Sequence, residues 1–239
     1  MSDAAHDDAV HEQFGRTAAE RAKHAAHHAP ELARHVEEFV EPTGDERALD
    51  VGSGTGALAL ALAPKVREVV ALELVPEQAE QARRLLGEHG NASVVEGDAM
   101  ALPFGRGEFD LVCERGVLHH VRRPEVVVAE MTRVCRPGGR LLVIDQLASL
   151  DPLRAIELDR FERARSATHT RLLSDQDLRY LFEINGLVLV RSRVEQHERE
   201  LEPYLDLSGC EGAEREQVRA LAPADPSPVE LGWYLLRRP

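Results

Sequence analysis

Cysteine and aromatic residues are scarce in this chain of 239 residues, and it contains no long hydrophobic run. The three cysteines, Cys113, Cys135 and Cys210, do not have metal-ligand spacing, so we expect neither a zinc site nor a disulfide. No apolar run approaches the roughly 20 residues of a membrane-spanning helix, and the acidic first eight residues lack the basic and then apolar order of a signal peptide. The sequence therefore predicts a cytoplasmic protein that has no membrane segment and binds no metal.

Basic residues are outnumbered by acidic ones, and the formal net charge is −13. Nucleic-acid binding depends on Lys and Arg contacts with phosphate, so this charge argues against DNA or RNA as the partner and favours a small molecule. One segment is locally rich in arginine and contains Arg160, Arg163, Arg165 and Arg171. We interpret this segment as the solvated surface of a helix.

Glycine is concentrated in one stretch, Asp50-Val51-Gly52-Ser53-Gly54-Thr55-Gly56. It follows an apolar strand predicted at residues 47–51, and an apolar helix is predicted immediately after it at residues 57–63. Glycine accepts positive φ and lets a ligand approach the backbone amides closely. A strand, a glycine turn and a helix N-terminus in succession indicate a ligand-binding turn.

Acidic residues follow two further predicted strands, at residues 68–73 and 93–96. Glu73 lies about 20 residues beyond the glycine turn, where a carboxylate accepts hydrogen bonds from ribose hydroxyls. Asp98 is placed to accept a hydrogen bond from an exocyclic amine such as that of adenine, while the amide of Ala99 serves a ring nitrogen. These two acids extend the predicted nucleotide site along one edge of a parallel sheet.

The other predicted elements complete an alternating α/β pattern. Residues 6–41 are predicted to form one or two helices, and we expect Pro30 to divide them. Further helices are expected at residues 76–88, 125–134, 152–167 and 175–185, and further strands at residues 109–113, 140–145, 187–190 and 229–236. The segment between Pro203 and Pro228 is interpreted as a helix with a proline-rich loop and has no assigned function.

The motifs in this order resemble the class I S-adenosylmethionine-dependent methyltransferases, and within them the UbiE-like small-molecule group, the methyltransferase domain 11 type. They are Leu-Asp-Val-Gly-Ser-Gly-Thr-Gly, Glu73, Glu-Gly-Asp-Ala with Leu-Pro-Phe, Phe-Asp-Leu-Val, Leu-His-His-Val and Arg-Pro-Gly-Gly. The resemblance implies a Rossmann-like α/β fold, with a seven-stranded, mostly parallel sheet, helices on both faces and an N-terminal helical lid. We expect residues 1–43 to form the lid segment, residues 44–147 the S-adenosylmethionine-binding core, and residues 148–239 the substrate-side helices and last strands.

The resemblance also implies which residues hold S-adenosyl-L-methionine. The glycine turn and the loop at Glu114 would surround the methionine part, Glu73 the ribose, and Asp98 with its neighbours the adenine. The full predicted set is Phe14, Asp50, Gly52, Ser53, Gly54, Gly56, Glu73, Leu74, Asp98, Ala99, Met100, Glu114 and Arg115.

Two further residues are candidates for catalysis. The sulfonium donor is already activated, so alignment and exclusion of water supply much of the rate, and a base is needed only for some acceptors. His119 is the candidate base, and Asp145 would hold its imidazole in one tautomer, as in similar natural-product methyltransferases. Alternatively, His119 or His120 caps the helix or holds the loop, and His169 lies in a flank where we expect solvent exposure.

The predicted activity is methyl transfer to the O, N or C atom of a small molecule by in-line displacement, in a monomer or homodimer. One alternative is a non-catalytic protein that binds S-adenosylmethionine as a sensor or assembly factor. Another is an NAD-dependent oxidoreductase, although the third glycine of the turn, Gly56, comes one position too early for a dinucleotide fingerprint. The acceptor itself cannot be read from the sequence.

Overall fold

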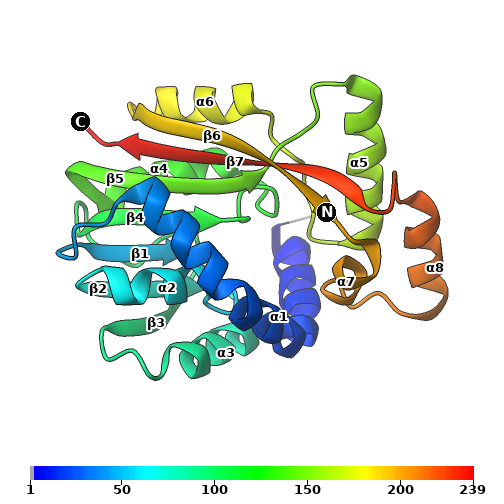
Figure 1. The fold of residues 1–239 in the computed structure, drawn as a ribbon, viewed down its shortest axis with the longest axis horizontal. Helices are drawn as coiled ribbons and strands as arrows, with labels where there is room; N and C mark the ends of the chain where they lie inside the picture. Colours follow the sequence, from blue (N-terminus) through cyan, green and yellow to red (C-terminus); the bar gives the residue numbers. More distant parts are fainter. Residues whose placement is uncertain (1–2) are drawn as a thin grey trace.

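Seven strands form one sheet in the order β3-β2-β1-β4-β5-β7-β6 in the computed structural model, which describes residues 3–239 (Figure 1). Residues 1 and 2 of the predicted lid segment lie outside the described residues. Only β7 is antiparallel to its neighbours β5 and β6, and the other neighbouring strands are parallel. The predicted seven-stranded, mostly parallel fold is therefore confirmed.

The strands are β1 (Arg47–Val51), β2 (Glu68–Glu73), β3 (Ala92–Glu96), β4 (Phe109–Arg115), β5 (Cys135–Gln146), β6 (Val188–Arg199) and β7 (Ser227–Arg237). The helices are α1 (Asp3–Val40), α2 (Ala57–Leu62), α3 (Pro76–Leu86), α4 (Pro124–Val134), α5 (Pro152–Arg165), α6 (Asp175–Ile184), α7 (Leu201–Asp206) and α8 (Gly212–Leu221). A short 3-10 turn at Ala63–Lys65 follows α2.

Two hydrophobic cores show that helices cover both faces of the sheet. On one face, α4 and α6 contribute Met131 and Leu178, which are fully buried against the strands. On the other face, α1 and α2 contribute Val36 and Leu62. A third, smaller cluster joins α5, α7 and α8 beyond the end of the sheet (Figure 1). The buried strands follow the near-continuous apolar pattern of a parallel sheet with both faces covered.

One continuous helix, α1, replaces the divided helices predicted for residues 6–41, and Pro30 lies inside it. A proline in a helix interior removes one backbone hydrogen bond and leaves the carbonyl of residue i−4 without its donor. Both Pro30 and Ala26 are exposed, so water can satisfy that carbonyl. Leu32, Val36 and Phe39 pack into the sheet core after the proline. The prediction that Pro30 divides the helix was therefore wrong.

The C-terminal part of the chain is more regular than predicted. Strand β6 continues to Arg199, well beyond the expected residues 187–190, and pairs along its length with β7. The segment after it contains two helices, α7 and α8, where one was expected. Ser174 forms a complete capping box with Asp177 at the start of α6.

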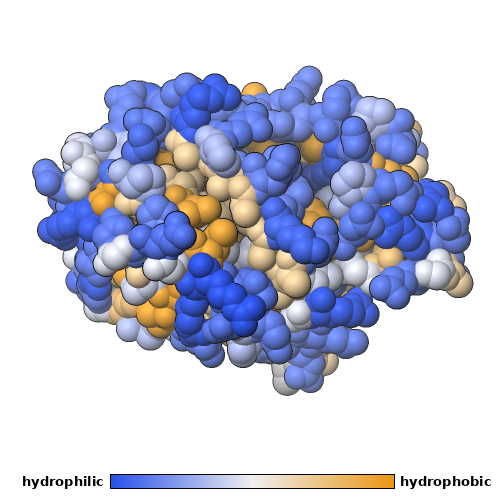
Figure 2. All heavy atoms as spheres, turned by 60° about the horizontal axis from the view of Figure 1, so that its bottom comes forward, coloured by the Kyte–Doolittle hydropathy of each residue, from blue (hydrophilic) through white to orange (hydrophobic). Residues whose placement is uncertain are grey.

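The surface is mostly hydrophilic on the face drawn in Figure 2, where apolar side chains gather in a band across the middle. Within residues 3–239, no helix combines the length and the hydropathy that crossing a membrane requires.

Candidate active site

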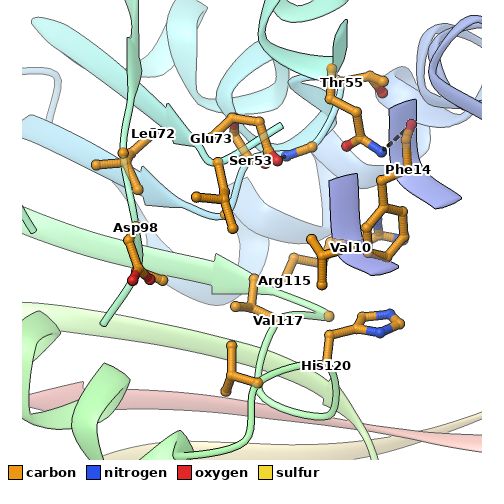
Figure 3. A pocket seen from close by; sticks show the side chains of 18 of the residues that line it. Val10, Phe14, Ser53, Thr55, Leu72, Glu73, Asp98, Arg115, Val117 and His120 are labelled. Atoms are coloured by element: carbon orange, nitrogen blue, oxygen red, sulfur yellow. Dashed lines mark hydrogen bonds between the residues drawn. The ribbon is translucent and has the colours of Figure 1, made fainter. Parts of the chain in front are cut away.

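The carboxyl ends of β1, β2 and β4 open onto a cavity of about 540 Å³. Pairing of Val51 with both Leu72 and Glu114 brings the three strand ends to one edge of the sheet. Helix α1 covers this edge, and its side chains Val10 and Phe14 point toward the cavity (Figure 3). The volume falls within the roughly 300–1,000 Å³ of typical ligand pockets.

The glycine turn after β1 presents backbone to the cavity. Gly52 has φ 63° and Gly54 has φ 57°, conformations that side-chain-bearing residues rarely adopt. A Cβ at Gly52 would stand 2.6 Å from a methyl carbon of Val117. The Oγ of Ser53 is buried and has no hydrogen-bond partner among the described residues. An open backbone and an unpartnered hydroxyl fit a polar ligand such as the methionine part of S-adenosylmethionine.

Glu73 lies at the end of β2 and is 6% exposed. Its Oε2 accepts from the amide of Gly54 at 2.7 Å and its Oε1 from the amide of Val75 at 3.0 Å. Burial raises the pKa of this carboxyl above its ordinary value, while the two amide donors oppose that rise. Each carboxylate oxygen keeps a further acceptor site, so Glu73 can still bind a diol.

Asp98 follows β3 and lies across the cavity from Phe14 in Figure 3. Its Oδ1 accepts from the amide of Met100 at 2.8 Å, which fixes the carboxylate in the turn. Leu72, Ala99 and Met100 line the same end of the cavity. This end therefore combines one carboxylate with apolar side chains, as a planar, hydrogen-bonding ring requires.

Ten predicted residues meet at this cavity: Phe14, Gly52, Ser53, Gly54, Glu73, Leu74, Asp98, Ala99, Met100 and Arg115. Three others lie behind it. The Oδ2 of Asp50 accepts from the amide of Ala59 in the first turn of α2, and burial raises the Asp50 pKa to about 7. Gly56 lets α2 pack against α3, because a Cβ there would approach the Cβ of Ala82 to 3.2 Å. Glu114 is fully buried, and one of its oxygens has no hydrogen-bond partner within residues 3–239; burial and Asp145 raise its pKa well above the ordinary value.

His119 and Asp145 form a close pair beside the cavity. The Nδ1 of His119 lies 2.5 Å from Oδ1 of Asp145, and the His119 amide donates to Oδ2 at 3.2 Å. The Asp145 side chain is only 3% exposed, whereas that of His119 is 15% exposed. Neither side chain lines the main cavity, although Gly116, which does, lies next to the His119 ring.

His120 lines the cavity itself and faces Phe14 edge to face (Figure 3). Its Nδ1 lies 2.9 Å from Oγ1 of Thr168, which lies 2.9 Å from Oγ of Ser166. Gln13 of α1 completes this hydrogen-bonded chain by donating to Ser166 at 2.9 Å. Burial, His119 and nearby arginines lower the His120 pKa well below its ordinary value, so the imidazole is neutral at pH 7.

Most of the cavity wall that α1 supplies was not predicted from the sequence. His6, Asp7, Val10, Arg21, His24 and Ala25 also line the cavity, together with Leu207 after α7. Positions 7, 10, 14, 21 and 24 repeat at intervals of three, four and seven, which is one face of a helix. That spacing was available in the sequence, but it does not say which neighbour the face meets.

The arginines that were expected on a solvated helix surface differ in their exposure. Arg165 is 5% exposed and forms a buried ion pair with Glu162, whereas Arg163 stays exposed. His169 is 5% exposed rather than solvent-exposed, and its Nε2 lies 3.2 Å from Asp159. Arg160, Arg163 and Arg171 are exposed as expected. The expectation was wrong for Arg165, whose guanidinium lies over the ring of Tyr204 in α7, and for His169.

Part of the chain is similar in sequence to known methyltransferases. Residues 49–143 match the family model described as a methyltransferase domain. An uncharacterized methyltransferase, YcgJ of Bacillus subtilis, is 32% identical over 62% of this chain and 59% of its own length. A demethylmenaquinone methyltransferase of Clavibacter sepedonicus is 32% identical over 59% of this chain and 58% of its own. The chain thus spans about three fifths of the length of these curated relatives.

Solved structures share the fold over most of the chain. The YcgJ structure superposes with a TM-score of 0.76 at 23% identity and covers 89% of this chain and 98% of its own. The [4+2]-cyclase SpnF superposes with a TM-score of 0.65 at 22% identity over 87% and 80% of the two chains. Because one of these neighbours is a cyclase, the fold by itself leaves the reaction open.

Proposed function

We propose that residues 49–143, which match a methyltransferase domain, are a class I methyltransferase domain of the UbiE-like type, and that the chain transfers a methyl group from S-adenosylmethionine to a small-molecule acceptor. The observation that carries the proposal is one cavity where the glycine turn, Glu73 and Asp98 converge. These groups suit the methionine, ribose and adenine parts of the donor in turn.

The donor supplies a methyl group on a positively charged sulfur, which is already activated for attack. The chain must therefore hold donor and acceptor in line and keep water out. Phe14 and Val10 of α1 and Leu207 after α7 supply apolar walls for that purpose. We propose that α1 is the lid of this cavity and that α7 closes it from the other side.

We propose His119 as the base for an acceptor that must lose a proton. With Nδ1 paired to Asp145, Nε2 is left to accept that proton, and the carboxylate stabilises the imidazolium that results. The second candidate is His120, favoured by its place in the cavity wall and by its link to Thr168. Its lowered pKa makes His120 a weaker base, and the neutral imidazole can instead form a hydrogen bond with the acceptor.

The activity is tested by incubating the protein with S-adenosylmethionine carrying a labelled methyl group and a fractionated cell extract. Label should appear in the small-molecule fraction in proportion to the S-adenosylhomocysteine formed. Label found only in protein or nucleic acid would contradict the proposed acceptor class, and no transfer in any fraction would contradict catalysis. With the acceptor fraction in hand, His119→Asn should slow transfer more than His120→Asn if His119 is the base.

A further inference from the structure

Arg21 lies in the cavity wall without a carboxylate partner. Its Nε donates to Oγ1 of Thr17 at 3.1 Å, and its guanidinium stands 4.7 Å from the ring centre of Phe14. No ion pair joins it to an acid within the described part of the chain. Burial, and then the charge of Arg165, lower its pKa to about 10, so it remains a cation at pH 7. Keeping a half-buried guanidinium charged costs free energy unless an anion pairs with it.

The carboxylates of the cavity form no ion pair with Arg21 among the described residues, although the charge of Glu73 raises the Arg21 pKa and so offsets part of the effect of burial. Glu73 and Asp98 accept backbone amides at the end assigned to the donor. Asp7 also lines the cavity, but no ion pair joins it to Arg21 among the described residues. Arg123, which also lines the wall, pairs with Glu125 outside the cavity.

Burial and nearby positive charges lower the pKa of His24, another residue of the cavity wall. Burial comes first in lowering the His24 pKa to about 4, and His28, Arg115 and Arg21 lower it further. S-adenosylmethionine itself has a sulfonium, an ammonium and one carboxylate at neutral pH, so its binding adds positive charge. The family resemblance places the loop of Glu114 and Arg115 beside the methionine part of the donor, and within residues 3–239 no ion pair joins Arg21 to an acid.

We propose that the methyl acceptor is a small, largely apolar organic anion whose charged group lies against Arg21; this rests on the methyl-transfer function proposed above. The apolar lining at Val10, Phe14, Val117 and Val121 suits the body of such a molecule. A guanidinium binds carboxylate and phosphate alike through paired hydrogen bonds. The acceptor class is therefore a carboxylate or a phosphate ester with a hydrocarbon or aromatic body.

The test measures binding of matched probes to protein saturated with S-adenosylhomocysteine, so that the donor site is filled. Benzoate is compared with benzamide, hexanoate with hexanamide, and phenyl phosphate with phenol, by ligand-observed NMR titration. In the wild-type protein, at least one anion should bind about tenfold more tightly than its neutral partner. Arg21→Gln should abolish that preference, and Arg21→Lys should restore part of it. The ratio of benzoate to phenyl phosphate affinities distinguishes the two anion chemistries.

Arg34→Gln is the matched control, because Arg34 lies on the same helix outside the cavity and pairs with Glu38. It should leave the anion preference unchanged. Equal binding of anionic and neutral probes, or binding of none, would contradict the proposal. So would an Arg21→Gln variant that loses S-adenosylhomocysteine affinity while keeping the anion preference, since Arg21 would then serve the donor. Failure of the wild-type protein to bind S-adenosylhomocysteine would instead contradict the proposed function.

Discussion

The two ends of the cavity are built in different ways. At the donor end, the groups are backbone amides and carboxylates at the ends of consecutive strands, such as Gly54, Glu73 and Asp98. At the acceptor end, they are side chains from α1, from the loop after β4 and from the turn after α7, which are far apart in the sequence. The first end follows from local βα units, whereas the second depends on how distant segments pack.

Glu162 tests how much the packing of α5 against α7, beyond the end of the sheet, depends on a buried charge network. Its carboxylate accepts from Arg165, Arg199 and Tyr204 and is 2% exposed. Removing one partner of a buried ion pair typically costs about 3–5 kcal/mol. We therefore expect Glu162→Gln to lower the free energy of unfolding by about that amount in urea denaturation at pH 7.

This effect should depend on pH in a defined direction. Burial opposes ionisation of Glu162, but its arginine and tyrosine partners prevail and lower its pKa to about 2, below the ordinary 4.5. Its stabilising contribution is therefore complete above pH 4.5 and is lost as the pH falls toward 2. Glu202→Gln is the matched control, because Glu202 pairs with Arg215 and Arg219 at the surface and should change stability little. A Glu162→Gln deficit that is equal at pH 7 and pH 3 would contradict this account.

Gly52→Ala tests the donor end. The substitution combines about 1–2 kcal/mol of left-handed backbone strain with about 1–3 kcal/mol of overpacking against Val117, because the new Cβ would lie 2.6 Å from its methyl. We expect lower thermal stability and at least tenfold weaker S-adenosylhomocysteine binding. Gly44→Ala is the control, since Gly44 has φ 94° with nothing within 4 Å of a Cβ. It should show the backbone cost alone, and equal effects of the two substitutions on binding would argue against a role for the turn.

Glu73→Gln tests the strand-end carboxylate. Hydrogen bonds to a charged group contribute about 1.5–3 kcal/mol each, so we expect S-adenosylhomocysteine affinity to fall about 10- to 100-fold in calorimetry. Glu68→Gln changes the same side chain at the opposite end of β2, where Glu68 pairs with Arg47, and should leave affinity unchanged. Unaltered binding by the Glu73 variant would remove this residue from the site.

Thr168→Val should have the smallest effect. The substitution interrupts the series of hydrogen bonds that links Gln13 to His120. It should lower the free energy of unfolding by about 0.5–1.5 kcal/mol. Nitrogen NMR should show changed His120 ring shifts with unchanged S-adenosylhomocysteine affinity. Thr132→Val removes a hydroxyl that donates only within α4 and should not move those shifts. If Thr168→Val left the His120 ring shifts unchanged, the hydrogen bonds through Thr168 would not determine the state of this imidazole.

Much of the donor end could be predicted from the sequence. Each strand from β1 to β4 ends near a glycine or an acid, and parallel strands bring their carboxyl ends to one edge. Asp50, Gly56 and Glu114 belong to the same motifs, yet they lie behind the cavity. A motif gives the order of residues along the chain, but the side of the turn that each side chain takes depends on alternation and packing.

The acceptor end could be predicted only in part. Apolar spacing identified a helix before β1, but its continuity through Pro30 depends on exposure of that turn. Arg165 resembled a solvated residue because Tyr204 of α7, over which its guanidinium lies, comes 39 residues later. His169 lies near His119, which comes 50 residues earlier in the chain. Pairing of His119 with Asp145 was expected and is present, whereas the place of His120 in the cavity wall required the packed structure.

The most direct test of the account is a calorimetric titration of the wild-type protein with S-adenosylhomocysteine and, separately, with NAD. The account predicts stoichiometric binding of S-adenosylhomocysteine that Glu73→Gln weakens, and no binding of NAD. Tight NAD binding without S-adenosylhomocysteine binding would contradict it.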